Sequence, residues 1–314
     1  MPIDFPFAKF HALGSDYLVL DPTQAPFDVT PQFAQALCDR RRGVGSDGIL
    51  LGPLAVPEAT GAFGLRIFNP DGSEAEKSGD GIRIFARYLL EAGHAQEPGC
   101  RIHTSAGTAE VRFLAADGSR IQVDMGRPSF RAGDIPFTGI AAQLEVLETP
   151  LFLPTGPITI TALSLGNPHC VLFPGEVSPA NARRLGAQIE KHPEFPERVN
   201  VQLVEVVTRR RIRIEIWERG AGYTPASGSS CAAAAACRRL GLVDERVTVQ
   251  MPGGSLDIEF TPEGRILMTG PVQPICRGFL HPDWKPLTAG YPKMVKGDAG
   301  ALAAAHSQIQ SDSG

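Results

Sequence analysis

The sequence has no long hydrophobic run, no paired cysteines and no large excess of charge of either sign. Its longest run of small apolar residues, Cys231 to Cys237, is far too short to cross a bilayer. The first ten residues mix proline, aspartate and lysine and contain no apolar core of a signal peptide. We therefore expect a cytoplasmic protein with no membrane contact.

Motifs for metals and common cofactors are also missing. The six cysteines, at positions 38, 100, 170, 231, 237 and 276, form no CxxC pair, a pattern typical of reduced cytoplasmic thiols rather than of disulfides or zinc. His169 and Cys170 are adjacent, which is a poor spacing for two ligands of one metal. The chain contains no P-loop, GxSxG or HExxH motif. No metal site is expected.

The charge pattern argues against a nucleic-acid partner. The formal net charge is −4 and the isoelectric point is near 6.0, so no global field attracts nucleic acid. Arginine runs occur at 40–42 and 209–211, without interleaved aromatic residues. The second run leads into Ile212–Ile216, whose alternation predicts a half-buried strand with a solvated charged face.

One glycine motif invites a different interpretation. Gly43–Gly48 satisfies GxGxxG, but it follows a helical segment (33–41) and leads into an apolar strand that starts at Ile49. A dinucleotide site needs a strand before the motif and a helix after it. The segment is therefore predicted to be a glycine turn without an NAD site.

The chain repeats itself. With 314 residues it suits two domains, and four features recur in the same order at an offset of roughly 145–150 residues. These are a Leu-Gly turn (Leu13 and Leu165), a Ser-Gly helix start (Ser78 and Ser227), a glycine after each helix (Gly93 and Gly241), and a strand–turn–strand–turn–strand series (101–125 and 247–268). We predict two lobes, 1–130 and 131–285, the second a duplicate of the first, followed by a flexible tail, 286–314.

Each lobe is predicted to hold one central helix. In the first, apolar residues from Ile82 to Leu90 fall at helical spacing, Ser78 or Asp80 can cap the start, and Gly93 suits the position past the end. In the second, Cys231 to Cys237 is almost entirely alanine, small enough for strands to surround it closely. The prediction is an α+β fold of two pseudo-symmetric lobes, each a mostly antiparallel sheet wrapped around a helix.

The two Ser-Gly helix starts are the natural place for chemistry. A helix N-terminus carries unpaired N–H groups and partial positive charge, so two that converge would hold a carboxylate. Two similar lobes that meet there would present like groups to opposite faces of one ligand, which suits a two-base proton transfer. Ser78 and Ser227 taken singly are more simply explained as helix caps, and only their pairing favours the functional interpretation.

Several long blocks resemble the diaminopimelate epimerase family. They are His11–Asp16, Arg42–Gly48, Asn69–Glu76, Gly166–Val171, Arg198–Val201 and Trp217–Gly222. The resemblance covers the chain from Phe7 to about Pro271. It implies a cofactor-independent isomerase that inverts an amino-acid α-carbon, a lobed fold shared with proline racemases, a small amino acid as ligand, and a homodimer.

The chain also departs from that family. The family has a cysteine at the head of each central helix, where this chain has Ser78 and Ser227. Tyr223 stands where the family has Glu, and Ser15 and Asp80 stand where it has Asn. Because Lys77, Pro225 and Ser230 differ as well, we favour natural divergence over a laboratory change.

The resemblance assigns further roles residue by residue. His169 would support the first catalytic position, Ser78, and Glu218 the second, Ser227. The distal end of the substrate would meet Asn69, Asn200 and Arg219, with Asn167 and Ser15 in the same wall. The N–H groups of Gly79, Asp80, Gly228 and Ser229 would receive the reacting carboxylate. The plain alternatives are turn residues for Asn69 and Asn200, and a surface pair for Glu218 and Arg219.

Serine changes what such a site can do. A thiol ionises near neutral pH with help from a helix N-terminus, whereas a hydroxyl needs an adjacent base. Three functions stay open: an epimerase assisted by His169 and Glu218, an isomerase or dehydratase of a related amino acid, and a non-catalytic binder. Cys231, one helical turn beyond Ser227, is expected to be a buried core thiol.

Overall fold

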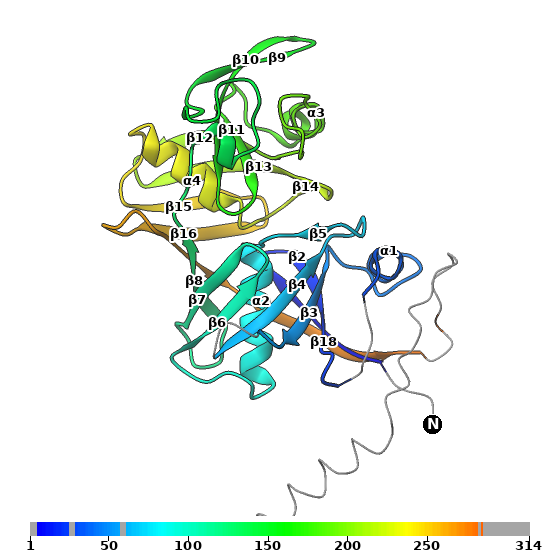
Figure 1. Cartoon of the computed structure of the whole chain (residues 1–314). Coiled ribbons are helices and arrows are strands. Elements are labelled where there is room, and N and C mark those ends of the chain that lie inside the picture. Colours follow the sequence, from blue (N-terminus) through cyan, green and yellow to red (C-terminus); the bar gives the residue numbers. More distant parts are fainter. Residues whose placement is uncertain (1–4, 25–28, 57–60, 282–283, 285–314) are drawn as a thin grey trace, which may run out of the picture.

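The protein is a two-lobed α+β molecule, described here from a computed structural model that covers residues 5–24, 29–56, 61–281 and 284 (Figure 1). Within these residues, 18 strands join into one hydrogen-bonded sheet system that curls around two central helices. The predicted tail, 286–314, lies outside the described residues. None of the helices in the described residues is long and apolar enough to span a membrane.

The elements follow one another in two series. The first series is β1 (Phe5–Ala12), β2 (Ser15–Leu20), α1 (Pro31–Cys38), β3 (Ile49–Leu54), β4 (Ala62–Phe68), β5 (Glu74–Ala75), α2 (Gly79–Glu91), β6 (Gly99–Thr104), β7 (Gly107–Phe113) and β8 (Arg120–Gly126). The second is the 3-10 helix η1 (Ala132–Asp134), β9 (Thr149–Leu153), β10 (Gly156–Ser164), β11 (Pro168–Leu172), α3 (Pro179–Ile189), β12 (Asn200–Thr208), β13 (Arg211–Glu218), β14 (Gly222–Thr224), α4 (Ser230–Arg239), β15 (Arg246–Met251), β16 (Gly254–Phe260), β17 (Ile266–Pro271) and β18 (Gln273–Leu280).

The two series use the same strand pairings. In the first, β2 runs parallel to β3, β3 antiparallel to β4, and β4 parallel to β6. In the second, β11 runs parallel to β12, β12 antiparallel to β13, and β13 parallel to β15. The remaining pairings are antiparallel, which confirms the predicted mostly antiparallel α+β fold.

The central helices form as their sequences predict. In α2 the apolar stripe is fully buried at Ile82, Phe85 and Leu89, and the Ser78 hydroxyl caps the first turn by accepting the Gly81 N–H. In α4 every residue from Ser230 to Cys237 is buried, because alanine side chains let the surrounding strands approach closely. Cys231 has no exposed surface, so the prediction of a core thiol is confirmed.

Two strand pairings tie the lobes together. β17 of the second series pairs with β8 of the first, and β18 returns to pair with β1, so the two chain ends of the fold lie side by side (Figure 1).

The glycine segment 43–48 connects α1 to β3, which confirms the helix–turn–strand order and leaves no dinucleotide motif. The Ile212–Ile216 strand is also confirmed, with its isoleucines buried and Arg213 exposed, but Glu215 on the face predicted to be solvated is buried.

Candidate active site

The N-termini of α2 and α4 touch each other through two glycines. A Cβ added to Gly228 would lie 2.8 Å from the backbone N of Gly79, and one added to Gly79 would lie 3.1 Å from the Cα of Gly228. No larger side chain fits at either place without pushing the lobes apart. The positive ends of the two helices therefore converge on one spot, an arrangement that suits the binding of a carboxylate. The Ser229 N–H, which was expected to take part, is bonded to Ser227 Oγ.

One cavity beside these glycines gathers every site residue predicted from the sequence. Its lining includes Ser15, Asn69, Ser78, Gly79, Asp80, Asn167, His169, Asn200, Glu218, Arg219, Ser227, Gly228 and Ser229. Three chemically active side chains that the sequence did not single out for the site, Tyr17, Asp47 and Lys77, line it too. Ser78 enters from the first lobe and Ser227 from the second.

Ser78 has two neighbours, and neither is a base. Its Oγ accepts the Gly81 N–H at 3.0 Å and lies 3.3 Å from the hydroxyl of Tyr17. The Tyr17 side chain is buried, and burial raises the pKa of its hydroxyl, with a further increase from the negative charges of Asp80, Asp47 and Glu218. Tyr17 therefore stays protonated at neutral pH.

Ser227 has a carboxylate beside it. The Ser227 Oγ accepts the Ser229 N–H at 3.1 Å, and the Ser229 hydroxyl donates to Glu218 Oε1 at 2.6 Å. Burial raises the pKa of Glu218, although hydrogen bonds from Ser229 and Ser227 partly offset this effect. A carboxylate with a raised pKa is a better proton acceptor than an ordinary one, so this wall of the cavity carries a base.

The two helix starts are alike but not identical. α2 begins directly after Ser78, whereas α4 begins after Ser229, two residues beyond Ser227. The extra residues form tight turns, with the Ser230 N–H bonded to Ser227 O at 3.2 Å and the Cys231 N–H bonded to Gly228 O at 3.0 Å. Ser227 thus lines the cavity and lies outside the helix. The N-cap residue of α4 is Ser229, and its side chain makes no capping hydrogen bond.

His169 lines the cavity, and its described hydrogen bond joins it to Asn167. Its Nε2 lies 2.8 Å from Asn167 Oδ1, and among the described residues no hydrogen bond joins it to Ser78. Burial, with a further contribution from Arg219, lowers the pKa of His169 to about 3. The ring is therefore neutral near pH 7 and a weak proton acceptor.

Replacing His169 by glutamine should reduce the acid sensitivity of folding. Between its unfolded pKa near 6.5 and its folded pKa of about 3, the unfolded chain binds a proton that the folded chain does not. This contribution to stability is complete above pH 6.5 and is lost as the pH falls, by about 1.4 kcal/mol per pH unit. Urea unfolding from pH 7 to pH 4 should show a shallower loss for His169→Gln than for the wild type, and parallel curves would contradict the assignment.

The distal wall is built around Arg219. Its guanidinium pairs with Glu76 of the other lobe and donates to Glu197 O at 3.2 Å. Its backbone N–H donates to Asn200 Oδ1 at 2.9 Å, while Asn200 Nδ2 donates to Pro168 O at 3.0 Å. The Asn200 amide thus fixes the position of Arg219, and Asn69 Nδ2 is bonded to Ser73 Oγ at 3.0 Å.

The floor of the cavity contains a buried ion pair. Arg83 has no exposed surface and donates to Asp80 Oδ1 at 2.6 Å, while burial raises the pKa of Asp80 against the lowering effect of Arg83. Lys77 donates to Met125 O at 2.7 Å, and burial lowers its pKa. Burial also raises the pKa of the Cys231 thiol to about 12, so this cysteine does not replace the missing thiolates.

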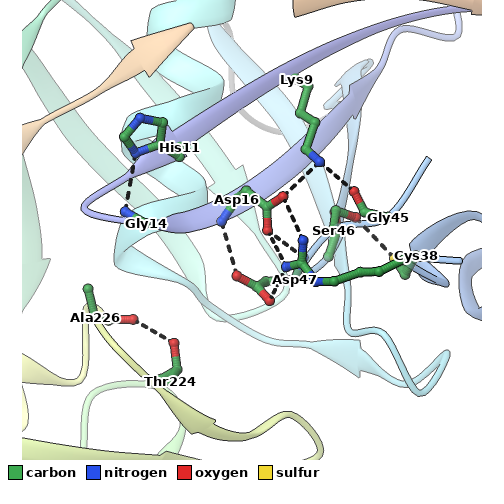
Figure 2. A network of polar contacts seen from close by, with 12 residues as sticks. Lys9, His11, Gly14, Asp16, Cys38, Gly45, Ser46, Asp47, Thr224 and Ala226 are labelled. Atoms are coloured by element: carbon green, nitrogen blue, oxygen red, sulfur yellow. Dashed lines mark hydrogen bonds and ion pairs between the residues drawn. The ribbon is translucent and has the colours of Figure 1, made fainter. Parts of the chain in front are cut away.

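A charged network holds the strand that carries Ser15 and Tyr17 (Figure 2). Asp16 lies 2.8 Å from Lys9 Nζ and 2.6 Å from an Arg40 nitrogen, and its backbone N–H donates to Asp47 Oδ2 at 3.1 Å. Burial alone would raise the pKa of Asp16, but the hydrogen bonds from Arg40 and Lys9 lower it to about 2. The network anchors the start of β2 at the cavity wall.

Known proteins with the same architecture share this arrangement of lobes. The sequence profile of the diaminopimelate epimerase family matches residues 7–131 and 161–275. The chain is 48% identical to diaminopimelate epimerase 2 of Nostoc sp. over 275 residues, which covers 87% of this chain and 95% of that protein. It is 40% identical to diaminopimelate epimerase 1 of the same strain, over 87% of this chain and 99% of that one. In fold it is similar to a hydroxyproline epimerase from Agrobacterium vitis, with a TM-score of 0.67, 17% identity, and coverage of 96% of this chain and 98% of that one.

Proposed function

Because the chain belongs to the diaminopimelate epimerase family, we propose that it interconverts LL- and meso-diaminopimelate without a cofactor, using hydroxyls where the family uses thiols. The observation that supports this most is the meeting of two helix N-termini at Gly79 and Gly228, with a serine from each lobe in the same cavity. The converging N–H groups would hold the reacting carboxylate, and the α-carbon would then lie between Ser78 and Ser227.

The proton chemistry would depend on Glu218. Of Ser78 and Ser227, Ser227 is the one described beside a carboxylate, and hydrogen bonding with Ser227 lowers the pKa of Glu218 toward its usual value. Glu218 would take the α-proton through the Ser227 hydroxyl. A hydroxyl is a much weaker acid than a thiol, so we expect a slower reaction than a thiol pair supports.

The distal wall favours a substrate with a second amino-carboxylate group. Arg219 lines the cavity and would meet the carboxylate of such a group, while its ion-pair partner Glu76 places a negative charge beside it. Arg219→Met should therefore raise KM for diaminopimelate at least tenfold with a smaller effect on kcat, because a lost charge pair of this kind costs about 2 kcal/mol or more. Arg213→Met, which breaks an exposed pair with Glu205, is the control and should leave both constants within about twofold.

We further propose the biological setting that the family membership suggests. The shared strand pairings support a duplication, with lobes at 1–130 and 131–285 and β18 returning to β1. The relatives' name, diaminopimelate epimerase, suggests a place in the supply of lysine and cell-wall precursors. A cytoplasmic location is part of the same proposal. A homodimer is the expected assembly.

Chiral chromatography of purified protein incubated with LL- or meso-diaminopimelate tests the proposed reaction. Both starting isomers should approach the same equilibrium mixture. Ser78→Ala/Ser227→Ala, purified in the same way, should be inactive and so rule out a contaminating host epimerase. No conversion of either isomer at high protein concentration would contradict the proposal. Binding without conversion would then identify a binder, and a keto product from a β-hydroxylated amino acid would identify a dehydratase.

A further inference from the structure

Ser78 and Ser227 have partners of opposite character. Near Ser227 lies the Glu218 carboxylate, which also accepts the Ser229 hydroxyl at 2.6 Å. Near Ser78 lies the Tyr17 hydroxyl, at 3.3 Å. One wall of the cavity therefore has a proton acceptor behind its serine, and the other wall has a phenol.

The hydrogen bonding around Ser78 orients its own proton. Its oxygen receives the Gly81 N–H at 3.0 Å, and Tyr17 can donate to it as well. A hydroxyl oxygen with two donors has both lone pairs occupied, so its single proton is left for a group in the cavity. Ser78 is thus arranged as a donor toward the ligand.

Tyr17 is placed to replace a proton that Ser78 gives away. Both side chains line the cavity, and the titratable hydroxyl of Tyr17 contacts the hydroxyl of Ser78. Negative charge on Asp80, Asp47 and Glu218 favours the protonated form of Tyr17. His169, the other candidate on this side, is bonded to Asn167 instead.

We propose that Tyr17 supplies, through Ser78, the proton that the α-carbon receives on one face, while Glu218 removes the proton from the other face. This assignment rests on the proposed epimerase function. The α-carbon–hydrogen bond breaks toward Ser227 and Glu218, which becomes protonated. The electron pair left on the α-carbon takes the Ser78 proton, and Ser78 takes the proton of Tyr17. Water then reprotonates the phenolate and removes the proton from Glu218, which restores the starting state.

Proton transfer on the two faces of the α-carbon should then respond differently when the Tyr17 hydroxyl is removed. Without Tyr17, Glu218 can still remove a proton and return a solvent-derived one from the same side. The isomer whose reacting proton faces Ser227 would exchange with solvent but would not invert. The other isomer, whose proton faces Ser78, reacts by the reverse of these steps, in which the phenolate form of Tyr17 accepts the proton through Ser78. Without the phenol this isomer would neither exchange nor invert. A merely structural role for Tyr17 would reduce both exchanges together.

Tyr17→Phe tests this assignment, with Tyr88→Phe as the matched control. Tyr88 is a buried tyrosine of the same lobe whose hydroxyl donates to Asp21 at 2.7 Å, and it does not line the cavity. Loss of the α-proton signal is followed by proton NMR in heavy water for LL- and meso-diaminopimelate, with the melting temperature recorded for each variant.

The expected result separates the variants clearly. Wild type and Tyr88→Phe exchange and interconvert both isomers. Tyr17→Phe exchanges one isomer without inversion, and its interconversion falls by about 10²–10⁴-fold, the usual contribution of a positioned acid. Interconversion at the wild-type rate, or an equal loss of exchange from both isomers, would overturn the role of Tyr17 alone. A wild-type protein that exchanges neither isomer would overturn the proposed function, and this role with it.

Discussion

The double variant Ser78→Cys/Ser227→Cys is expected to interconvert diaminopimelate isomers about 10²–10⁴-fold faster than the wild type, the range that a well-matched acid or base contributes. Both positions lie at converging helix N-termini, where the positive end of a helix lowers a thiol pKa toward neutrality. A serine hydroxyl gains far less because its pKa starts much higher. The rate is measured by chiral chromatography from each isomer.

Controls separate the thiol chemistry from other effects of the substitution. Each single cysteine variant should gain less than the pair, because only one face recovers its acid or base. Ser178→Cys replaces another helix-cap serine, at the start of α3 and outside the cavity lining, and should keep the wild-type rate. A folded double variant no faster than the wild type would show that the missing thiols do not limit this enzyme.

Glu218→Gln is expected to lower interconversion by about 10²–10⁴-fold, because it removes the carboxylate behind Ser227. Glutamine keeps the shape and can still accept the Ser229 hydroxyl, so the fold and the substrate affinity should change little. Steady-state kinetics should therefore show a loss in kcat with a nearly constant KM.

The pH dependence gives a second test of Glu218. A base acts only when deprotonated, and burial raises the pKa of this carboxyl. As the pH falls, wild-type activity should therefore begin to decline at a higher pH than it would with an ordinary glutamate as the base. The residual activity of Glu218→Gln should lack this decline. Glu205→Gln, at an exposed pair with Arg213, is the control. A Glu218→Gln activity within about threefold of wild type would exclude Glu218 as the base, given the range expected for one.

Local patterns predicted the two central helices, and the family resemblance supplied most of the residues that line the cavity. The stripe from Ile82 to Leu90 and the alanine run from Ala232 to Ala236 depend on periodicity and side-chain size, both of which can be read directly along the chain. The repeated Ser-Gly starts pointed to one site because a duplication brings equivalent positions face to face.

Partners distant in sequence could not be predicted in the same way. The Tyr17–Ser78 contact joins residues 61 positions apart, and the Arg219–Glu76 pair joins residues 143 apart. Periodicity tells which face of an element is buried but not what covers it. The return of β18 to β1 was missed for the same reason, since most of its residues are exposed and carry no pattern that names a partner strand.

Some roles depended on hydrogen bonds that only the fold determines. The amide of Asn200 is engaged by Pro168 and the backbone of Arg219, so it positions a ligand-facing group. His169 is bonded to Asn167 rather than to Ser78. Tyr17 directly precedes the apolar residues Leu18–Leu20 of β2, and its hydroxyl was the one feature in the sequence that could have marked it as a site residue.

The most direct measurement is the exchange of the α-proton of LL-diaminopimelate in heavy water, followed by proton NMR with the wild-type protein and with Ser78→Ala/Ser227→Ala. The central claim is that a serine-based cavity removes and returns an α-proton. It predicts that the wild type replaces many α-protons per protein molecule and forms the meso isomer, while the double alanine variant does not. An unchanged α-proton signal with concentrated wild-type protein, or equal exchange by both proteins, would contradict it.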